Sequence, residues 1–177
     1  VIGRQFSVPL LLSVLAPLSE AELYPALDHL VEREFVLPPA GGAGDEYNFR
    51  HVLVSDAIYS TLLRRSQSDL HGQVGEALER VYADQIDKHV EILARHYAFS
   101  PRAERALHYL ILAGQKAARA YLNDQARQHY EQALGLLPQV HHSIAQAVQV
   151  NMGLGDVLAF AGEYGTARLQ YQAALDS

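Results

Sequence analysis

The segment Ala-Arg-Gln-His-Tyr-Glu-Gln-Ala at residues 126–133 returns as Ala-Arg-Leu-Gln-Tyr-Gln-Ala-Ala at residues 167–174, 41 residues later. The same offset places Gly114 on Gly155. Small and apolar residues recur here at intervals of three and four, which is the spacing of a helix with one buried face. Small residues let two helices approach closely, and an aromatic ring such as Tyr130 fills the space between them. The stretch therefore predicts two successive pairs of antiparallel helices.

Within each pair the order of glycine, alanine, aromatic residue and alanine resembles the tetratricopeptide repeat. Pro138 stands where that repeat closes. The usual period is about 34 residues, so about seven residues around 139–145 must lengthen a connection or a helix. An alternative register that begins near Asp87 also fits the repeat pattern, but it would assign one helix to two repeats. The resemblance implies tetratricopeptide-type helix pairs over residues 102–177, the last one truncated.

In tetratricopeptide repeats the first helix of each pair lines the concave face, and this register assigns eight side chains to that face. They are His108, Ile111, Gln115, Arg119, Gln149, Met152, Asp156 and Phe160. Five of them are our candidate partner-binding residues: Gln115, Arg119, Met152, Asp156 and Phe160. An exposed methionine and phenylalanine among polar neighbours would suit an extended or helical peptide. The alternative is that Met152 and Phe160 pack within the core or against a further repeat.

The first fifty residues predict two helices followed by a small β-hairpin, which is the outline of a winged helix. Ser19 and Glu22 have the spacing of a capping box at a helix start. Pro25 predicts a kink or a later start of the same helix. Residues 35–37 and 47–49 are β-prone and flank a loop rich in proline and glycine.

The remaining residues have a helical period almost without a break. Ser100 and Pro101 are expected as the N-cap and first residue of one of these helices. The predicted fold class is therefore all-α with a small β-hairpin. It comprises a winged-helix-like domain at 1–50, a linking helical hairpin region at 51–101, and the tetratricopeptide-type pairs at 102–177.

Composition narrows the classes of function. A net charge of -6 argues against a dedicated nucleic-acid binder, because such proteins rely on many lysine and arginine contacts to phosphates. The absence of cysteine removes disulfides and thiolate metal sites and fits a cytoplasmic location. No apolar run is long enough to span a bilayer, so we expect no membrane partner. The chain begins without methionine and ends within an amphipathic pattern, which predicts a segment of a larger protein.

The familiar motifs of catalysis and metal binding are missing. The glycine-rich run at 41–44 is not followed by the lysine and hydroxyl residue of a phosphate-binding loop. Nine histidines are present, but His89 and His96 are two helical turns apart, which is too far for a simple chelate. No Gly-x-Ser-x-Gly nucleophile elbow occurs. We therefore expect no catalytic residue, no metal site and no cofactor of the chain's own.

Several short motifs along the chain point to one family. They are Val1-Ile2-Gly3-Arg4-Gln5-Phe6, Tyr47-Asn48-Phe49-Arg50-His51-Val52-Leu53, Ile58-Tyr59-Ser60-Thr61-Leu62-Leu63, Leu70-His71 and Leu93-Ala94-Arg95-His96-Tyr97. Together they resemble the region after the ATPase core in bacterial signal-transduction ATPases with numerous domains. This family includes types joined to nucleotide cyclase domains or to transcriptional regulators. The resemblance implies that a winged helix and a tetratricopeptide superhelix follow a core that switches between ADP-bound and ATP-bound states.

The function expected from this resemblance is a non-catalytic interaction and regulatory module. It would couple the nucleotide state of an upstream ATPase core, contacted in cis, to a protein or peptide on the concave helical surface. The segment around His51 resembles the Met-His-Asp motif of related switch ATPases, in which the histidine touches the β-phosphate of bound ADP. The resemblance gives that role to His51, with Val52 in place of the aspartate. Alternatively, His51 caps or packs at the junction between hairpin and helix.

A segment of a transcriptional regulator that contacts DNA through the winged helix is the alternative function. Residues 19–34 carry five acidic side chains against the single Arg33. Such a surface would repel a phosphate backbone, whereas a reading helix needs positive and polar side chains. We therefore expect the winged helix to be an architectural joint and nucleic acid not to be the partner.

Overall fold

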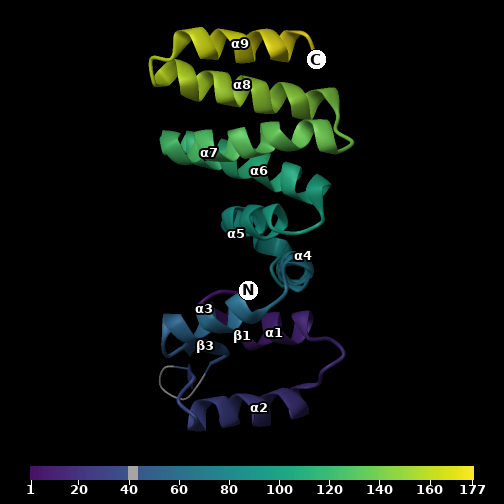
Figure 1. Ribbon diagram of the computed structural model, residues 1–177, viewed down its shortest axis with the longest axis vertical. Coiled ribbons are helices and arrows are strands. Elements are labelled where there is room, and N and C mark those ends of the chain that lie inside the picture. Colours follow the sequence, from purple (N-terminus) through teal and green to yellow (C-terminus); the bar gives the residue numbers. More distant parts are fainter. Residues whose placement is uncertain (40–43) are drawn as a thin grey trace. The chain divides into compact units, whose positions relative to one another are not determined.

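The computed structural model describes residues 1–39 and 44–177. Residues 40–43, which hold most of the glycine-rich run, lie outside the described residues. The chain divides into two compact units, Val1–Ile86 and Asp87–Ser177. The described part is mostly helical with a small antiparallel sheet, which confirms the predicted fold class at that level (Figure 1). The domain boundaries predicted near residues 50 and 101 stay predictions.

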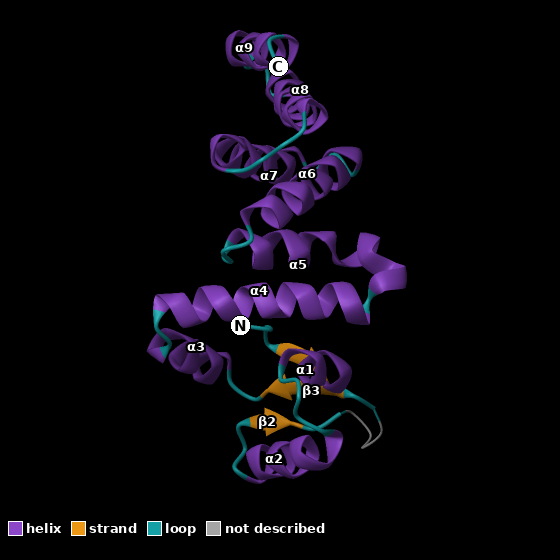
Figure 2. Cartoon of the chain, turned by 90° about the vertical axis from the view of Figure 1, so that its right-hand side faces the viewer, coloured by secondary structure: helices purple, strands orange, loops and turns teal. Residues whose placement is uncertain are grey.

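The sheet of the first unit contains three strands within the described residues, in the order β1-β3-β2 (Figure 2). These strands are β1 (Gln5–Ser7), β2 (Val36–Leu37) and β3 (Glu46–Phe49). Strand β3 pairs antiparallel with both neighbours, with Phe6 opposite Tyr47 and Leu37 opposite Asn48. The two β-prone segments of the sequence are therefore strands of one hairpin, as predicted. The contribution of β1 was not predicted.

Two helices complete the core of this unit, α1 (Val8–Val14) and α2 (Glu20–Glu32). The buried cluster consists of Phe6, Val8, Leu23, Leu27, Val36 and Tyr47. The Phe6 and Tyr47 rings stack with centroids 6.1 Å apart, so β1 is tied to β3 by side chains as well as by the backbone.

Helix α2 begins with the predicted capping box. The Glu22 carboxylate accepts hydrogen bonds from the Ser19 N–H at 3.0 Å and the Ser19 hydroxyl at 2.7 Å. These bonds lower the pKa of Glu22. Pro25 lies inside the helix, which already starts at Glu20, so the later start considered for Pro25 is wrong. The cap offsets part of the cost of the helical hydrogen bond that proline cannot donate.

Helices α3 (Val52–Thr61) and α4 (Arg64–Val81) follow the sheet. Helix α4 packs on α1, and its Arg80 donates hydrogen bonds to the carbonyl and hydroxyl oxygens of Ser13, each at 3.1 Å. Helix α3 has no buried residue. Leu53, Ile58 and Leu63, in α3 and just after it, are all exposed. The first unit therefore leaves an apolar helix surface uncovered.

The second unit is a series of helices joined by short turns. Their bounds are α5 (Ile86–Ala98, whose first residue belongs to the first unit), α6 (Ala103–Arg119), α7 (Asn123–Leu136), α8 (Ile144–Phe160) and α9 (Tyr164–Leu175). Helix α6 packs along α7, and α8 along α9 (Figure 1). Helix α6 begins at Ala103, so the start predicted at Pro101 is wrong. The Ser100 hydroxyl instead accepts from the Arg102 N–H and donates to the Tyr97 carbonyl, which makes a turn.

Each helix pair is closed by a tyrosine ring against a glycine of the other helix. A Cβ atom added at Gly114 would lie 2.8 Å from Cε1 of Tyr130, and one at Gly155 would lie 2.5 Å from Cε1 of Tyr171. Tyr130 also meets the next pair, because a Cβ atom at Gly153 of α8 would overlap its ring. The predicted contact is therefore present twice, and Gly153 adds a contact that joins the pairs.

The turns of the two pairs also correspond. Tyr121 follows α6 with φ 60°, and Gly162, 41 residues later, follows α8 with φ 82°. At both ends a hydrogen bond reaches back across the last turn, from Leu122 N–H to the Ala117 carbonyl and from Glu163 N–H to the Leu158 carbonyl. This is the geometry of a Schellman cap. The backbone adopts it twice, although only the second pair uses glycine.

We predict that Gly153→Ala and Gly135→Ala change stability in opposite directions. At Gly153 the new methyl group would overlap the buried Tyr130 ring, so we expect a loss of about 2 kcal/mol in unfolding free energy. At Gly135 a Cβ atom meets nothing within 4 Å, so alanine should stabilise α7 by up to about 1 kcal/mol. Urea unfolding followed by circular dichroism measures both. Changes of the same sign would contradict the role of Tyr130.

Candidate functional site

The five predicted partner-binding residues lie on two neighbouring helices. Gln115 is half-buried and Arg119 exposed on α6, while Met152, Asp156 and Phe160 are exposed on α8. These helices contact each other directly. Within each helix the residues are four apart, so they share a face. We call these five residues the α6/α8 surface. Ile111, which was also assigned to this face, is 3 % exposed and belongs to the core, so that assignment is wrong.

The centre of the α6/α8 surface is organised by two tyrosines. Burial raises the pKa of Tyr130; the charge of Asp156 raises it further and that of Arg119 opposes this. The structure thus brings Arg119 of α6 and Asp156 of α8 near one phenol. The Tyr171 hydroxyl donates a hydrogen bond to Asp156 Oδ1 at 2.9 Å, which fixes the carboxylate. Burial and this hydrogen bond raise the pKa of Tyr171.

Apolar side chains flank Asp156 on α8, one helical turn before it and one after it. Phe160 is 73 % exposed and Met152 is 42 % exposed. The surface therefore combines two exposed apolar side chains with a fixed carboxylate and an arginine. A partner could make both apolar and charged contacts with it. Such a combination is typical of sites that bind a partner protein.

His51 lies at the junction between β3 and α3. Its backbone is the N-cap of α3, but its side chain is exposed and makes no capping hydrogen bond. The alternative that His51 caps at the junction is therefore confirmed for the backbone, while packing of its side chain there is not seen, because that side chain is exposed. Among the described residues the imidazole remains available to a group outside the first unit.

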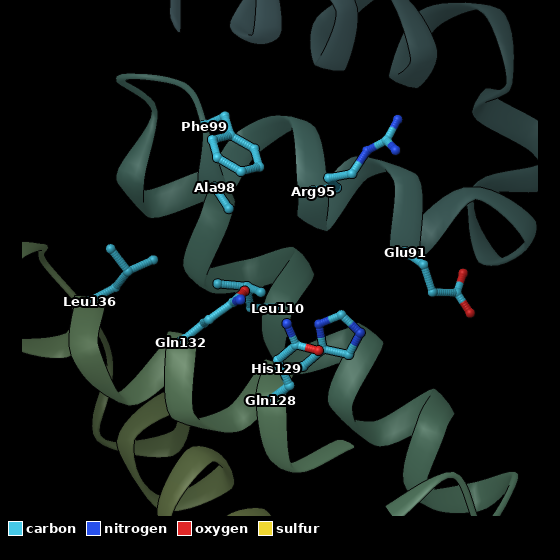
Figure 3. Close-up of a pocket in the computed structure, with 9 residues that line it drawn as sticks. All are labelled: Glu91, Arg95, Ala98, Phe99, Leu110, Gln128, His129, Gln132 and Leu136. Carbon is cyan, nitrogen blue, oxygen red and sulfur yellow. The ribbon is translucent and has the colours of Figure 1, made fainter. Parts of the chain in front are cut away.

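A groove that sequence analysis did not predict lies between α5 and α7. Its volume is about 600 Å³. It is lined by Glu91, Arg95, Ala98, Phe99, Leu110, Gln128, His129, Gln132 and Leu136. Figure 3 shows Ala98, Phe99 and Leu136 toward one end and Glu91 and His129 toward the other. Apart from Leu110 of α6, the lining comes from α5, from the residue after it, and from α7, so the groove shares no residue with the α6/α8 surface.

The charged side chains of the groove differ in their partners. Lys116 Nζ donates to Glu91 Oε2 at 2.9 Å and to the Asp87 carbonyl at 2.8 Å. Burial raises the pKa of Glu91, but the hydrogen bond and charge of Lys116, with smaller contributions, outweigh burial and lower it. Arg95 is exposed and makes no ion pair with the described residues. The groove therefore has a neutralised acid and an unpaired cation.

His129 occupies the polar end of the groove. Its Nδ1 atom is buried and has no hydrogen-bond partner among the described residues. Burial lowers the pKa of the imidazole, and the nearby charge of Glu91 opposes that effect only in part. The neutral form is therefore favoured in the folded chain.

Sequence reasoning missed the groove because no residue type marks it. Gln128, His129 and Gln132 belong to the polar positions of an amphipathic helix, which usually face water. They line a groove only because α5 and α7 both pack on α6. The sequence contained one signal that α5 belongs with these helices. The residues from Asp87 onward also match the repeat, in the alternative register.

Among the residues that the structure describes, no group of three or more histidine, aspartate or glutamate side chains could hold a metal ion. None of the helices in residues 1–39 and 44–177 is long and apolar enough to cross a membrane.

The lowered pKa of His129 predicts a loss of stability at acidic pH. At about pH 7.5, one unit above the ordinary histidine pKa, the imidazole is mostly neutral in both the folded and unfolded states. As the pH falls below that value, the unfolded chain binds the proton more readily than the folded chain, so the unfolding free energy decreases. We expect His129→Gln to lose less stability than the wild type between about pH 7.5 and about pH 5.5 in urea unfolding.

The matched control is His141→Gln, which removes an exposed imidazole before α8 and outside the groove. The pH dependence of the control should follow the wild type. Parallel profiles for His129→Gln and the wild type would show that burial does not disfavour the charged form of this residue.

Comparisons with known proteins find similarity to a longer bacterial protein. No family model matches the chain. No solved structure matches it either. An uncharacterized protein of Rhizobium meliloti (strain 1021) is 32% identical over 145 residues, which is 81% of this chain and 14% of that protein. The chain thus corresponds to a small part of a much longer bacterial relative.

Proposed function

We propose that the chain is a non-catalytic protein-interaction and regulatory module of a larger signalling ATPase. In this proposal it couples the nucleotide state of an upstream ATPase core to the binding of a protein or peptide. The observation that carries the proposal is the α6/α8 surface, where the Tyr171 hydroxyl holds Asp156 between the exposed Met152 and Phe160. The similarity to a small part of a long bacterial protein supports the role of a module.

The first unit supports the contact with an ATPase core in cis. Helix α3 has no buried residue, and Leu53 is 80 % exposed. An apolar helix surface of this kind favours a contact with another folded part. His51 stands at the first turn of the same helix with a free side chain. A core that covers α3 would bring bound nucleotide within reach of this imidazole.

The charge of α2 favours an architectural joint over the DNA-contacting alternative. Glu20, Glu22, Asp28 and Glu32 are all exposed. Glu34, which follows the helix, is also exposed and has Arg50 at 3.3 Å as an ion-pair partner. Helix α2 thus has a largely acidic surface, which opposes contact with phosphates.

A photo-crosslinking experiment tests the α6/α8 surface. The longer natural protein is made in its own cells with a benzophenone amino acid in place of Phe160. We expect a discrete crosslinked product with a partner protein or with another segment of the same protein. Met152→Asp, eight residues earlier on the same face of α8, should reduce the yield several-fold because it places a charge in the apolar contact.

The matched control carries the benzophenone at Ile144, which is 68 % exposed at the first position of α8. We expect less product there. Equal yields at the two positions, or a yield at residue 160 that Met152→Asp leaves unchanged, would show that this surface does not bind a partner.

A second experiment tests the nucleotide-sensing role proposed for His51. In the longer protein, His51→Ala should lower the amount of ADP that remains bound after purification, because a contact to the β-phosphate is lost. Bound nucleotide is measured by ion-exchange chromatography after denaturation. His29→Ala, which removes an exposed histidine from α2, is the control. Unchanged ADP retention and basal activity in His51→Ala would exclude the role.

A further inference from the structure

We propose that the groove between α5 and α7 is a second binding site, which takes an extended peptide with an apolar side chain next to an acidic residue. The site is distinct from the α6/α8 surface, because the two share no residue. Its volume of about 600 Å³ suits a few side chains of a peptide and is well within the usual range for binding pockets.

The apolar end of the groove provides the anchor. Leu110 of α6 closes its floor and is almost completely buried. Phe99 on one side is 62 % exposed, and Leu136 faces the same space from α7 (Figure 3). A leucine or phenylalanine of a peptide placed here would bury its own surface together with that of Phe99, which water now contacts.

Two amides on α7 match the backbone of an extended chain. Gln128 and Gln132 are exposed and make no side-chain hydrogen bond with the described residues. They are one helical turn apart, a rise of about 6 Å along α7. In an extended peptide the groups that face one side repeat every two residues, about 6.7 Å. Each carboxamide can therefore donate to a carbonyl and accept from an N–H of successive residues on that side.

The charged side chains of the groove favour a peptide in which an acidic residue stands next to the apolar one. Glu91 is already paired with Lys116 at 2.9 Å, whereas Arg95 has no ion-pair partner among the described residues. The Arg95 guanidinium extends outward from α5 in Figure 3, so it would meet a carboxylate at the rim of the groove. A basic peptide would instead place like charges together, and an uncharged one would leave the arginine unpaired.

Fluorescence anisotropy with labelled synthetic peptides tests the proposal. Nine-residue probes with Gly-Ser flanks carry Asp-Leu-Phe, Lys-Leu-Phe or Asp-Ser-Ser at the centre. We expect the Asp-Leu-Phe probe to bind with a Kd on the order of 10–100 µM and the others at least about fivefold more weakly. Arg95→Glu should reverse the preference between the Asp-Leu-Phe and Lys-Leu-Phe probes. Arg168→Glu, the same charge reversal at an exposed site on α9, should leave it unchanged.

The two glutamines have a separate readout. Gln128→Ala combined with Gln132→Ala should weaken the Asp-Leu-Phe and Lys-Leu-Phe probes by the same factor, because backbone contacts do not depend on side-chain charge. N-methylation of the central amides of the Asp-Leu-Phe probe should weaken its binding to the wild type and have less effect on the double variant. Thermal unfolding confirms that each variant is folded.

The proposal is overturned if no probe binds at millimolar concentration. It is also overturned if Arg95→Glu does not change the preference between the acidic and basic probes. None of these measurements involves Met152, Asp156 or Phe160. A negative result with the peptide probes therefore does not count against partner binding at the α6/α8 surface. Failure of the crosslink at residue 160 likewise does not count against peptide binding in the groove.

Discussion

The second unit depends on the Tyr130 ring, which lies between Gly114 of α6 and Gly153 of α8. The space for a Cβ atom at either glycine is occupied by this ring, so a larger residue at either position would displace it. Tyr130 is 3 % exposed and belongs to the buried cluster that holds α6, α7, α8 and α9 together. One aromatic side chain thereby sets how closely three helices approach, because tight packing leaves little room to adjust.

The candidate partner surface follows from this packing. Because α6 and α8 both contact Tyr130, Arg119 and Asp156 lie close enough to its hydroxyl to influence its pKa in opposite directions. Tyr171, which occupies the equivalent position in the second pair, uses its hydroxyl to hold Asp156. A tyrosine that closes a helix pair therefore also orients Asp156, which lies between the exposed Met152 and Phe160 on α8.

Features that repeat in the sequence were predictable, and features that depend on a single contact were not. Gly114 and Gly155 could be recognised because each has a tyrosine 16 residues later. Gly153 has no such counterpart, since the equivalent residue in α6 is Leu112. Strand β1 escaped prediction because three residues are too few to show an alternating pattern. The helix start predicted at Ser100 and Pro101 was wrong because the same pair of residues can also make a turn.

The α5/α7 groove could not be predicted for a related reason: it exists only where two helices meet a third. Helix α7 contributes Tyr130 to the glycine contact and Gln128, His129 and Gln132 to the groove. A ligand that widened the groove by shifting α7 would have to move Tyr130 away from Gly114 and Gly153. Because the cluster around Tyr130 is closely packed, that movement would cost several contacts at once. The α7 wall of the groove is therefore held in place by the same tyrosine that organises the α6/α8 surface.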